Sequence, residues 1–455
     1  MNKREFLKAS GALLTTALLP VISSGEPMYS ESPTITGKRT NWSGNYTYST
    51  DKLFLPASTE EVRHIVKAAP KLRTLGTTHS FNGIADSTAA QISLKGLDSM
   101  VLDRATRTVT VGGGVPYGKL APYIDSRGFA VHNLASLPHI SVAGACSTGT
   151  HGSGIKNGNL STAVSGLEIV TPDGEIVHLS RQKDGDAFKG AVVSIGALGV
   201  ITKVTLDVEP TFQVAQTVYQ NLSFDVLKDH FDEIMGSGYS VSLFTDWQNH
   251  RATQVWIKRR IDSGAKPNLD PQFFGATLAT KKLHPLEGHD AEACTEQMGI
   301  PGPWYERLPH FRMAFTPSSG QELQSEYFVP REHAYEAILA VEQIRDLITP
   351  HLFITELRTI AEDDLWISPC YKRPSAAIHF TWKPEWPDVQ KVLPHIEEKL
   401  APFNARPHWA KLFTMAPDRL HQMHPRLADF RKLTQTYDPR AKFHNAFMDT
   451  NVFEA

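Results

Sequence analysis

The chain has 455 residues, of which 41% are hydrophobic and 21% are charged, a composition typical of a globular protein long enough for two or three domains. Its formal net charge of -2 gives no electrostatic basis for binding nucleic acid or an anionic membrane surface. The three cysteines, Cys146, Cys294 and Cys370, follow no metal-ligand spacing and cannot all pair with one another. We therefore expect neither a disulfide framework nor a metal centre.

Residues 1–25 have the features of an export signal. The basic residues 2–8 precede a short apolar run, residues 9–22, and then Ser23-Ser24-Gly25. The run is too short for a comfortable membrane span, so we expect a cleaved signal peptide and no span in the mature protein. The stretch is similar to a twin-arginine signal, with Lys3 in place of the first arginine. These features predict a periplasmic or exported protein; a buried or interfacial helix is the alternative.

Short strands, helices and turns alternate over residues 40–208. The sequence Ser58-Thr59-Glu60-Glu61 has the side chains of a capping box and precedes a helix with an apolar face. Strands are expected at 100–102 and 108–111, and the turn residues 171–174 indicate a hairpin between 167–170 and 175–179. We expect these elements to form a mixed sheet flanked by helices.

Two stretches in this segment are rich in glycine, serine and threonine. Residues 76–82 read G-T-T-H-S-F-N, and residues 136–154 read S-L-P-H-I-S-V-A-G-A-C-S-T-G-T-H-G-S-G. Backbone N–H groups in such loops approach a ligand closely, and successive amides form an anion-binding nest suited to a pyrophosphate. One histidine, His79, lies inside the first loop. Taken alone, that loop is equally explained as a turn that ends a strand.

Three other motif-like strings favour structural explanations. Residues 113–119 match G-x-x-x-x-G-K, but Leu120 replaces the Ser or Thr that would hold magnesium, so a strand end followed by a helix is expected. No G-x-G-x-x-G follows a strand to open a helix, which argues against a Rossmann-type dinucleotide site. His421 and His424 are spaced like helical metal ligands, but without a further ligand cluster they are expected to be a surface pair.

The sequence from 209 to 404 is richer in tryptophan, proline and charged residues. Strands are expected at 240–247 and 253–259, and a helix at 332–348. In the second strand, alternation places Gln254, Trp256 and Lys258 on one face. Residues 405–455 are too few to form a core alone.

Two further strands carry paired polar residues. Glu356 and Arg358 lie two apart within 353–360, and His379 and Thr381 lie two apart within 377–382, so each pair shares one face of its strand. The four side chains could line one pocket wall. The alternative is a salt-bridging pair on the surface beside a polar strand face.

Taken together, these motifs resemble the vanillyl-alcohol oxidase superfamily of flavoproteins, and within it the alditol oxidases and sugar-lactone oxidases. The resemblance runs from about Asn41 to Phe447. Ala410 stands where alditol oxidases often have glycine, as it does in the aldonolactone enzymes. Besides the two loops, the resemblance rests on G-A-L-G-V-I-T at 196–202, F-T-D-W at 244–247, T-P-S-S-G at 316–320, E-x-R-T at 356–359, H-F-T-W at 379–382 and R-P-H-W-x-K at 406–411.

The resemblance implies an α+β fold of two domains, with an FAD-binding domain at 40–208, an inserted α+β substrate-binding cap domain at 209–404, and a segment at 405–455 that returns to the FAD domain. It implies FAD as the cofactor, bonded covalently to His79. The other cofactor-binding residues that it implies are Gly76, Thr77, Thr78, Ser80, Phe81, Asn82, Ser141, Gly144, Thr148, Gly149, Thr150, His151, Ile201 and His408.

The implied reaction is oxidation of the terminal hydroxyl of a polyol such as xylitol or sorbitol to the aldose, with oxygen reduced to hydrogen peroxide. Lys411, Arg358 and Glu356 are the implied catalytic residues, with His379 as an alternative base, and Ser136, Glu356, Arg358 and Thr381 are the implied substrate contacts. A monomer is expected. The alternatives are an aldonolactone oxidase or dehydrogenase on the same scaffold, and a non-catalytic periplasmic flavin- or sugar-binding protein.

Overall fold

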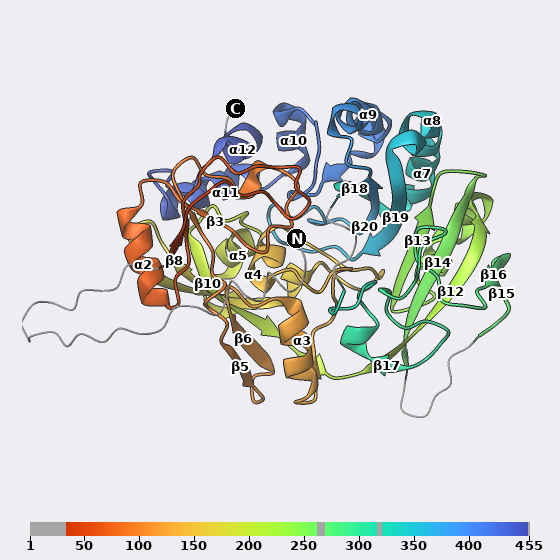
Figure 1. Cartoon of the computed structure of the whole chain (residues 1–455), viewed down its shortest axis with the longest axis horizontal. Coiled ribbons are helices and arrows are strands. Elements are labelled where there is room, and N and C mark those ends of the chain that lie inside the picture. The colour runs from red at the N-terminus through yellow and green to blue at the C-terminus, as the bar shows by residue number, and fades with distance from the viewer. Residues whose placement is uncertain (1–32, 262–268, 316–320, 454–455) are drawn as a thin grey trace, which may run out of the picture. The chain divides into compact units, whose positions relative to one another are not determined.

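Three large β-sheets organise the part of the chain that the computed structural model describes, residues 33–261, 269–315 and 321–453 (Figure 1). The predicted signal peptide at 1–25 and the motif at 316–320 lie outside the described residues. The first two sheets are formed by the N-terminal half of the chain. The third is formed by the remainder.

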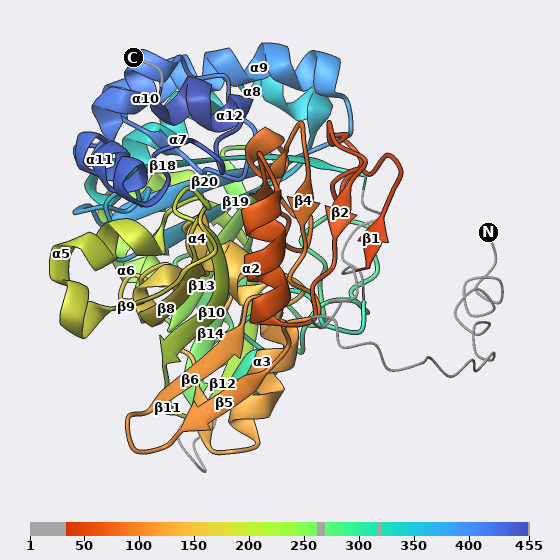
Figure 2. The same cartoon turned by 90° about the vertical axis from the view of Figure 1, so that its left-hand side faces the viewer.

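The first sheet has four short strands in the order β1-β2-β4-β3, with parallel pairing on both sides of β4. Helix α2, Thr59–Ala68, begins where the capping box predicts, because Ser58 Oγ accepts from the Glu61 amide at 3.2 Å. Its apolar face packs into a core shared with β4 and with β8 of the second sheet, so α2 lies between the two sheets (Figure 2). The strands are β1 Thr34–Ile35, β2 Leu53–Phe54, β3 Arg73–Thr74 and β4 Gln91–Ile92.

The second sheet has five antiparallel strands in the order β5-β6-β10-β8-β9. The predicted hairpin is confirmed, and Gly174 supplies the positive φ of 75° that its turn needs. The expectation of one mixed sheet is wrong: β4 already pairs with β2 and β3, so it offers no free edge to β5. The elements are β5 Met100–Asp103, β6 Thr108–Gly112, β8 Val164–Val170, β9 Ile176–Ser180 and β10 Val200–Asp207, with helices α3 Tyr117–Asp125, α4 Val142–Ser147 and α5 Arg181–Val192. A small pair, β7 Phe129–Ala130 and β11 Glu209–Pro210, accompanies them.

The third sheet joins 10 strands, all paired antiparallel. Figure 1 shows the helices α7, α8 and α9 gathered along one side of β18, β19 and β20. The strands are β12 Gln213–Ser223, β13 Ser240–Thr245, β14 Arg251–Ile261, β15 Gln272–Phe273, β16 Ala276–Leu278, β17 Gly302–Pro303, β18 Leu323–Pro330, β19 Leu352–Ile360, β20 Ser375–Trp382 and β21 Arg406–Pro407. The helices are α6 Leu227–Met235, α7 Ala334–Glu342, α8 Arg345–Ile348 and α9 Trp386–Lys399.

Side-chain alternation gives the third sheet two different faces. Tyr327, Leu357 and Ile378 share a hydrophobic core with α6, α7 and α9. On the other face, register places Glu326 opposite His379, and His379 opposite Glu356. One face of three neighbouring strands therefore carries a row of buried ionisable side chains.

The C-terminal helices α10 Pro417–Met423, α11 Leu427–Tyr437 and α12 Ala446–Met448 return to the N-terminal half. Leu420, Phe430 and Met448 belong to the same core as Ile169 of β8. These helices therefore pack on the core of the N-terminal half, whereas the division of the chain into domains stays a prediction. The predicted helix at 332–348 is broken near Ile344 into α7 and α8.

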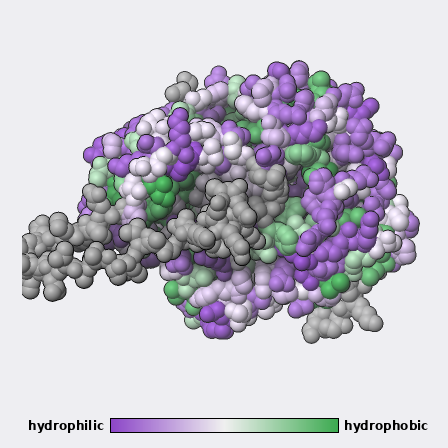
Figure 3. Space-filling model, viewed as in Figure 1, coloured by the Kyte–Doolittle hydropathy of each residue, from purple (hydrophilic) through white to green (hydrophobic). Residues whose placement is uncertain are grey.

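The visible surface is polar over most of the face in Figure 3, with hydrophobic residues scattered between hydrophilic ones. Among the described residues, no helix is both long enough and apolar enough to span a membrane. Cys146, Cys294 and Cys370 are buried free thiols.

Candidate active site

A cavity of about 870 Å³ is bounded on one side by the two glycine-rich loops and on the other by the polar face of the third sheet. It brings together residues as far apart in the sequence as Trp42 and Lys411. Of the residues predicted for the site, those that line it are Gly76, Thr77, Thr78, His79, Ser80, Phe81, Ser136, Ser141, Gly144, Thr148, Thr150, His151, Ile201, Glu356, Arg358, His379, Thr381, His408 and Lys411.

The loop at 76–82 holds His79 in a fixed orientation. His79 Nδ1 donates to the Thr77 carbonyl at 2.7 Å, and its ring stacks on Trp42 with centroids 5.1 Å apart. The intervening residue, Thr78, has a positive φ of 63°, which is costly for a β-branched side chain. Burial lowers the pKa of His79 to about 4, so the imidazole is neutral near pH 7.

The second loop packs against the first through small residues. The Ser141 amide donates to Thr77 Oγ1 at 3.3 Å. A methyl group added at Gly144 would lie 2.8 Å from Ser141 Oγ, and one added at Gly76 would lie 3.2 Å from the same atom. This surface of glycines, hydroxyls and backbone amides fits a cofactor bound through its phosphates, as the sequence predicts for FAD.

Two predicted cofactor residues do not line the cavity. Asn82 instead donates from Nδ2 to the carbonyls of Trp409 and Lys411, at 2.9 and 2.8 Å. Gly149 supplies a turn with φ of 70° beside Pro369. Both therefore support neighbouring parts of the site, and Asn82 fixes the backbone that carries Lys411.

The opposite wall is built around the buried guanidinium of Arg358. Its Nη2 donates to Glu326 Oε1 at 2.8 Å, its Nη1 donates to Ser136 Oγ at 3.4 Å, and its Nε lies 3.6 Å from Glu356 Oε1. This arrangement confirms that Glu356 and Arg358 share one strand face, and it excludes the alternative of an exposed surface pair.

Ion pairing keeps both carboxylates of this wall charged. Burial alone raises the pKa of Glu326, but His151 at 3.0 Å and Arg358 lower it well below its usual range. In the same way, burial raises the pKa of Glu356, and Arg358 and His310 lower it further than burial raises it. Arg358 therefore lies between two buried anions, and its own pKa is raised by them despite burial.

Lys411 and His379 meet at one acceptor. Both Lys411 Nζ and His379 Nε2 donate to Gln324 Oε1, the latter at 3.1 Å. Lys411 Nζ also lies 4.9 Å from the centre of the Phe81 ring, next to the His79 loop. Burial lowers the pKa of Lys411 to about 8 and that of His379 to about 3, so Lys411 is the stronger base of the two.

Two family models match segments that contribute to the two walls. The model of an FAD-binding domain matches residues 50–180, and that of D-arabinono-1,4-lactone oxidase matches residues 315–451. An alditol oxidase of a Streptomyces species is 47% identical over 414 residues, which cover 90% of this chain and 97% of that protein. The chain belongs to the alditol oxidase family.

More distant relatives share its length and fold. L-Gulonolactone oxidase of Mus musculus is 26% identical over 90% of this chain and 97% of its own. The solved structure of cholesterol oxidase from Brevibacterium sterolicum superposes with a TM-score of 0.75 at 13% identity, covering 96% of this chain and all of that one. These matches confirm the expected α+β FAD-binding fold for this alditol oxidase family member.

Several polar residues that line the cavity of this family member were not predicted from the sequence, among them Glu326, Gln324 and His310. Glu326 and Gln324 alternate with the core residues of β18, so a hydrophobic period of two in 323–330 could have indicated that both face away from the core. His310 lies outside any regular element. No local pattern marks it.

No group of three or more His, Cys, Asp or Glu side chains suited to a metal ion occurs within residues 33–261, 269–315 and 321–453. The expectation that His421 and His424 form a surface pair is wrong for His424, which is buried and stacks on Trp409 with centroids 5.0 Å apart. His424 packs there because Trp409 belongs to the core that also contains Ile169 of β8.

Proposed function

We propose that this protein oxidises the terminal hydroxyl of a sugar alcohol, such as xylitol or sorbitol, to the aldose, with oxygen as the final electron acceptor and hydrogen peroxide as the second product. One observation carries the proposal: a chain 47% identical to an alditol oxidase joins the FAD-binding loops and the Glu356–Arg358 wall in one cavity. When bound, FAD supplies the hydride acceptor.

The residues opposite the loops are suited to orient a neutral polyol. Such a substrate offers no charge, so its position must come from several hydrogen bonds to its hydroxyls. Ser136, Glu356, Arg358 and Thr381 present both donors and acceptors to the cavity. Arg358 also supplies positive charge, which favours an alkoxide that develops in the transition state.

Lys411 is the residue best placed to move the hydroxyl proton. Its neutral amine at Nζ would take the proton from the reacting hydroxyl, whereas its charged form would only polarise that hydroxyl. His379 is the weaker candidate, because its pKa is about 3 and its Nε2 already donates to Gln324. Supporting this role, Asn82 and Phe81 hold the Lys411 backbone against the His79 loop.

The proposal includes a covalent bond between FAD and His79. A neutral imidazole provides the lone pair that bond formation needs, and the low pKa of His79 supports this state. Acid precipitation followed by mass measurement of the His79 peptide tests the bond. An unmodified peptide from fully active enzyme would contradict it.

A sugar-lactone substrate is the second candidate, because the D-arabinono-1,4-lactone oxidase model matches residues 315–451. To separate the two, purified protein is mixed with xylitol, sorbitol and aldonolactones, with oxygen and with an artificial dye. We expect flavin absorption, a higher kcat/KM for polyols, and hydrogen peroxide as product. Preference for a lactone would favour the second candidate, and a stable flavin spectrum without any turnover would favour a non-catalytic binding protein.

We further propose that the mature protein begins after about Gly25 and acts as a monomer outside the cytoplasm. The basic start and the apolar run at 9–22 support export. Fractionation of the host, with sequencing of the N-terminus and measurement of solution mass, tests both points. An intact N-terminus in the cytosol would contradict export.

A further inference from the structure

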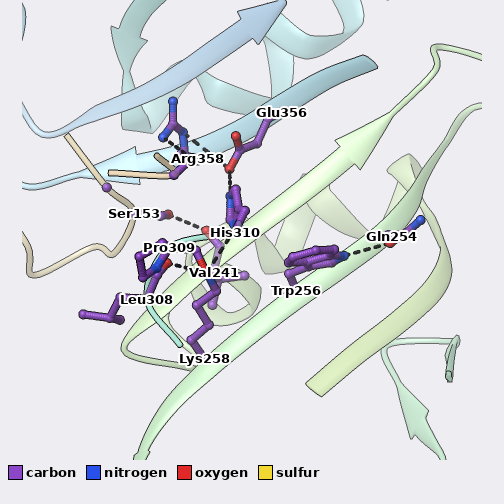
Figure 4. Close-up of polar contacts among 12 residues, drawn as sticks. Ser153, Val241, Gln254, Trp256, Lys258, Leu308, Pro309, His310, Glu356 and Arg358 are labelled. Carbon is purple, nitrogen blue, oxygen red and sulfur yellow. Dashed lines mark hydrogen bonds and ion pairs between the residues drawn. The ribbon is translucent and has the colours of Figure 1, made fainter. Parts of the chain in front are cut away.

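A buried lysine lies behind the substrate wall, outside the cavity lining (Figure 4). Lys258 on β14 is 1% exposed. Its Nζ donates to the Leu308 carbonyl at 2.5 Å, to the Pro309 carbonyl at 3.2 Å and to His310 Nδ1 at 3.0 Å. All three protons of its ammonium group are therefore used.

These contacts fix the protonation of His310. Because Nδ1 accepts from Lys258, the ring proton of neutral His310 must be on Nε2. That nitrogen donates to Glu356 Oε1 at 2.7 Å. Figure 4 shows the resulting chain from Lys258 through His310 to Glu356 and Arg358, which crosses from β14 to β19.

The same chain leaves one oxygen of Glu356 available. Oε1 accepts from His310 and lies 3.6 Å from Arg358 Nε. Oε2 makes no hydrogen bond with any residue in the described part of the chain. Glu356 lines the cavity, so Oε2 is left to accept from a substrate hydroxyl.

Burial of this lysine is costly and calls for a compensating role. The charged and titratable groups around Lys258 are Glu356 and Arg358 from β19 and His310 and Cys294 from the segment 279–315. The one carboxylate among them, Glu356, makes no hydrogen bond with Nζ, and burial lowers the pKa of Lys258 to about 7. An apolar side chain of similar length would avoid this desolvation cost.

We propose that Lys258 is a positioning residue for substrate binding: it holds His310 with its proton on Nε2, and His310 holds Glu356 with Oε2 directed to the substrate. The inference rests on the proposed function, since it assigns Glu356 to the polyol. Lys258 itself touches no substrate.

The first test is a double-mutant cycle on the FAD-loaded enzyme with xylitol. We expect Lys258→Met to lower kcat/KM by about tenfold or more, mainly through a higher KM, because Glu356 is left less well oriented. In a Glu356→Ala background, Lys258→Met should change kcat/KM by less than about threefold. Equal losses in both backgrounds would overturn the proposal, because they would mean that Lys258 acts only through general stability.

Gln254→Met is the matched control. Gln254 lies on the same face of β14, is buried, and donates to the His284 carbonyl at 2.8 Å, as Lys258 donates to carbonyls. Within the described residues, its side chain hydrogen-bonds to His284 and Trp256 and not to Glu356. This variant should leave KM unchanged even if it loses as much thermal stability as Lys258→Met.

A second pair of variants serves if Lys258→Met fails to fold. His310→Gln keeps one acceptor and one donor, so it should retain KM within a few-fold, whereas His310→Met should raise KM as Lys258→Met does. Equal KM values for the two His310 variants would overturn the proposal.

A measurement without substrate separates this inference from the proposed function. The ¹⁵N resonances of His310, assigned by their absence in His310→Gln, report which ring nitrogen is protonated. We expect a protonated Nε2 and an unprotonated Nδ1 in the parent. Burial lowers the pKa of His310 and the Lys258 cation lowers it further, so this pKa should shift upward in Lys258→Met. The opposite tautomer, or an unchanged titration, would overturn the inference even if xylitol is oxidised. The expected tautomer in a protein that oxidises no polyol would instead refute only the proposed function.

Discussion

The two walls of the cavity are built by opposite means. The wall at 76–82 and 136–154 presents glycines, small hydroxyls and backbone amides, and its shape depends on the absence of side-chain atoms. The wall on the third sheet presents buried ionic side chains from three neighbouring strands, held by one another. The first should therefore be sensitive to atoms that are added, and the second to charges that are removed.

The largest effect should follow from removing a cation from the charged wall. We expect Arg358→Ala and Lys411→Met each to slow reduction of the flavin by roughly a hundredfold or more, because both cations act mostly in the transition state. Attachment of FAD should stay intact, since neither cation belongs to the glycine-rich wall. Stopped-flow measurement with anaerobic xylitol decides the matter, and parental rates in both variants would place the substrate elsewhere.

The second prediction concerns pH and the same wall. If the neutral amine of Lys411 accepts the proton, flavin reduction should rise about tenfold per pH unit below pH 8 and level off above it. The sign follows because Lys411 loses its proton as pH rises through its pKa of about 8. A rate that falls over the same range would assign the charged form to the reaction, and Lys411→Met provides the control profile.

The third prediction tests the glycine-rich wall. In a His79→Ala background, where retention of FAD depends on non-covalent contacts, Gly144→Ala should weaken FAD binding by roughly tenfold, because the added methyl lies 2.8 Å from Ser141 Oγ. Gly76→Ala, with 3.2 Å to the same atom, should have a smaller effect. Equilibrium titration of FAD gives both values. A larger loss of FAD affinity in Gly76→Ala than in Gly144→Ala would show that the distance to Ser141 does not determine which added methyl group is tolerated.

The smallest effect is on acid stability. The folded pKa of Glu326 lies well below the unfolded value near 4.5, so its contribution to stability is complete above that pH and is lost as pH falls. As pH is lowered below about 5, the free energy of unfolding should therefore decrease less steeply in Glu326→Gln than in the parent. The two slopes should differ by up to about 1.4 kcal/mol per pH unit. Denaturant titrations at several pH values measure it. If the free energies of unfolding of the two proteins change with pH in parallel, Glu326 is not the carboxylate that destabilises the parent at low pH.

The difference between the walls also explains how much the sequence revealed. The glycine-rich wall comes from two stretches that are each continuous in sequence, so the residues within each stretch were found together. Counted over both sides of the cavity, 19 predicted residues line it. The pair Glu356 and Arg358 was found because alternation within one strand is local. Glu326 was missed because its place beside His379 and Glu356 depends on pairing of three strands that are 20 to 50 residues apart.

The fold follows the same rule. The start of α2 and the β8–β9 hairpin depend on neighbouring residues and were predicted correctly. The division of the N-terminal strands into two sheets, the burial of His424 and the chain from Lys258 to Glu356 depend on contacts between distant segments. Propensity and periodicity carry no information on such contacts.

The hydrogen bonds between the His79 loop and the C-terminal segment have a consequence for biosynthesis. The Phe81 amide donates to the Ala410 carbonyl at 2.8 Å, and Asn82 binds the carbonyls of Trp409 and Lys411. A ribosome makes the loop early and its partners last, so a nascent chain carries an unsupported loop through most of its synthesis. Stable capture of the cofactor then marks a chain whose translation has passed residue 411.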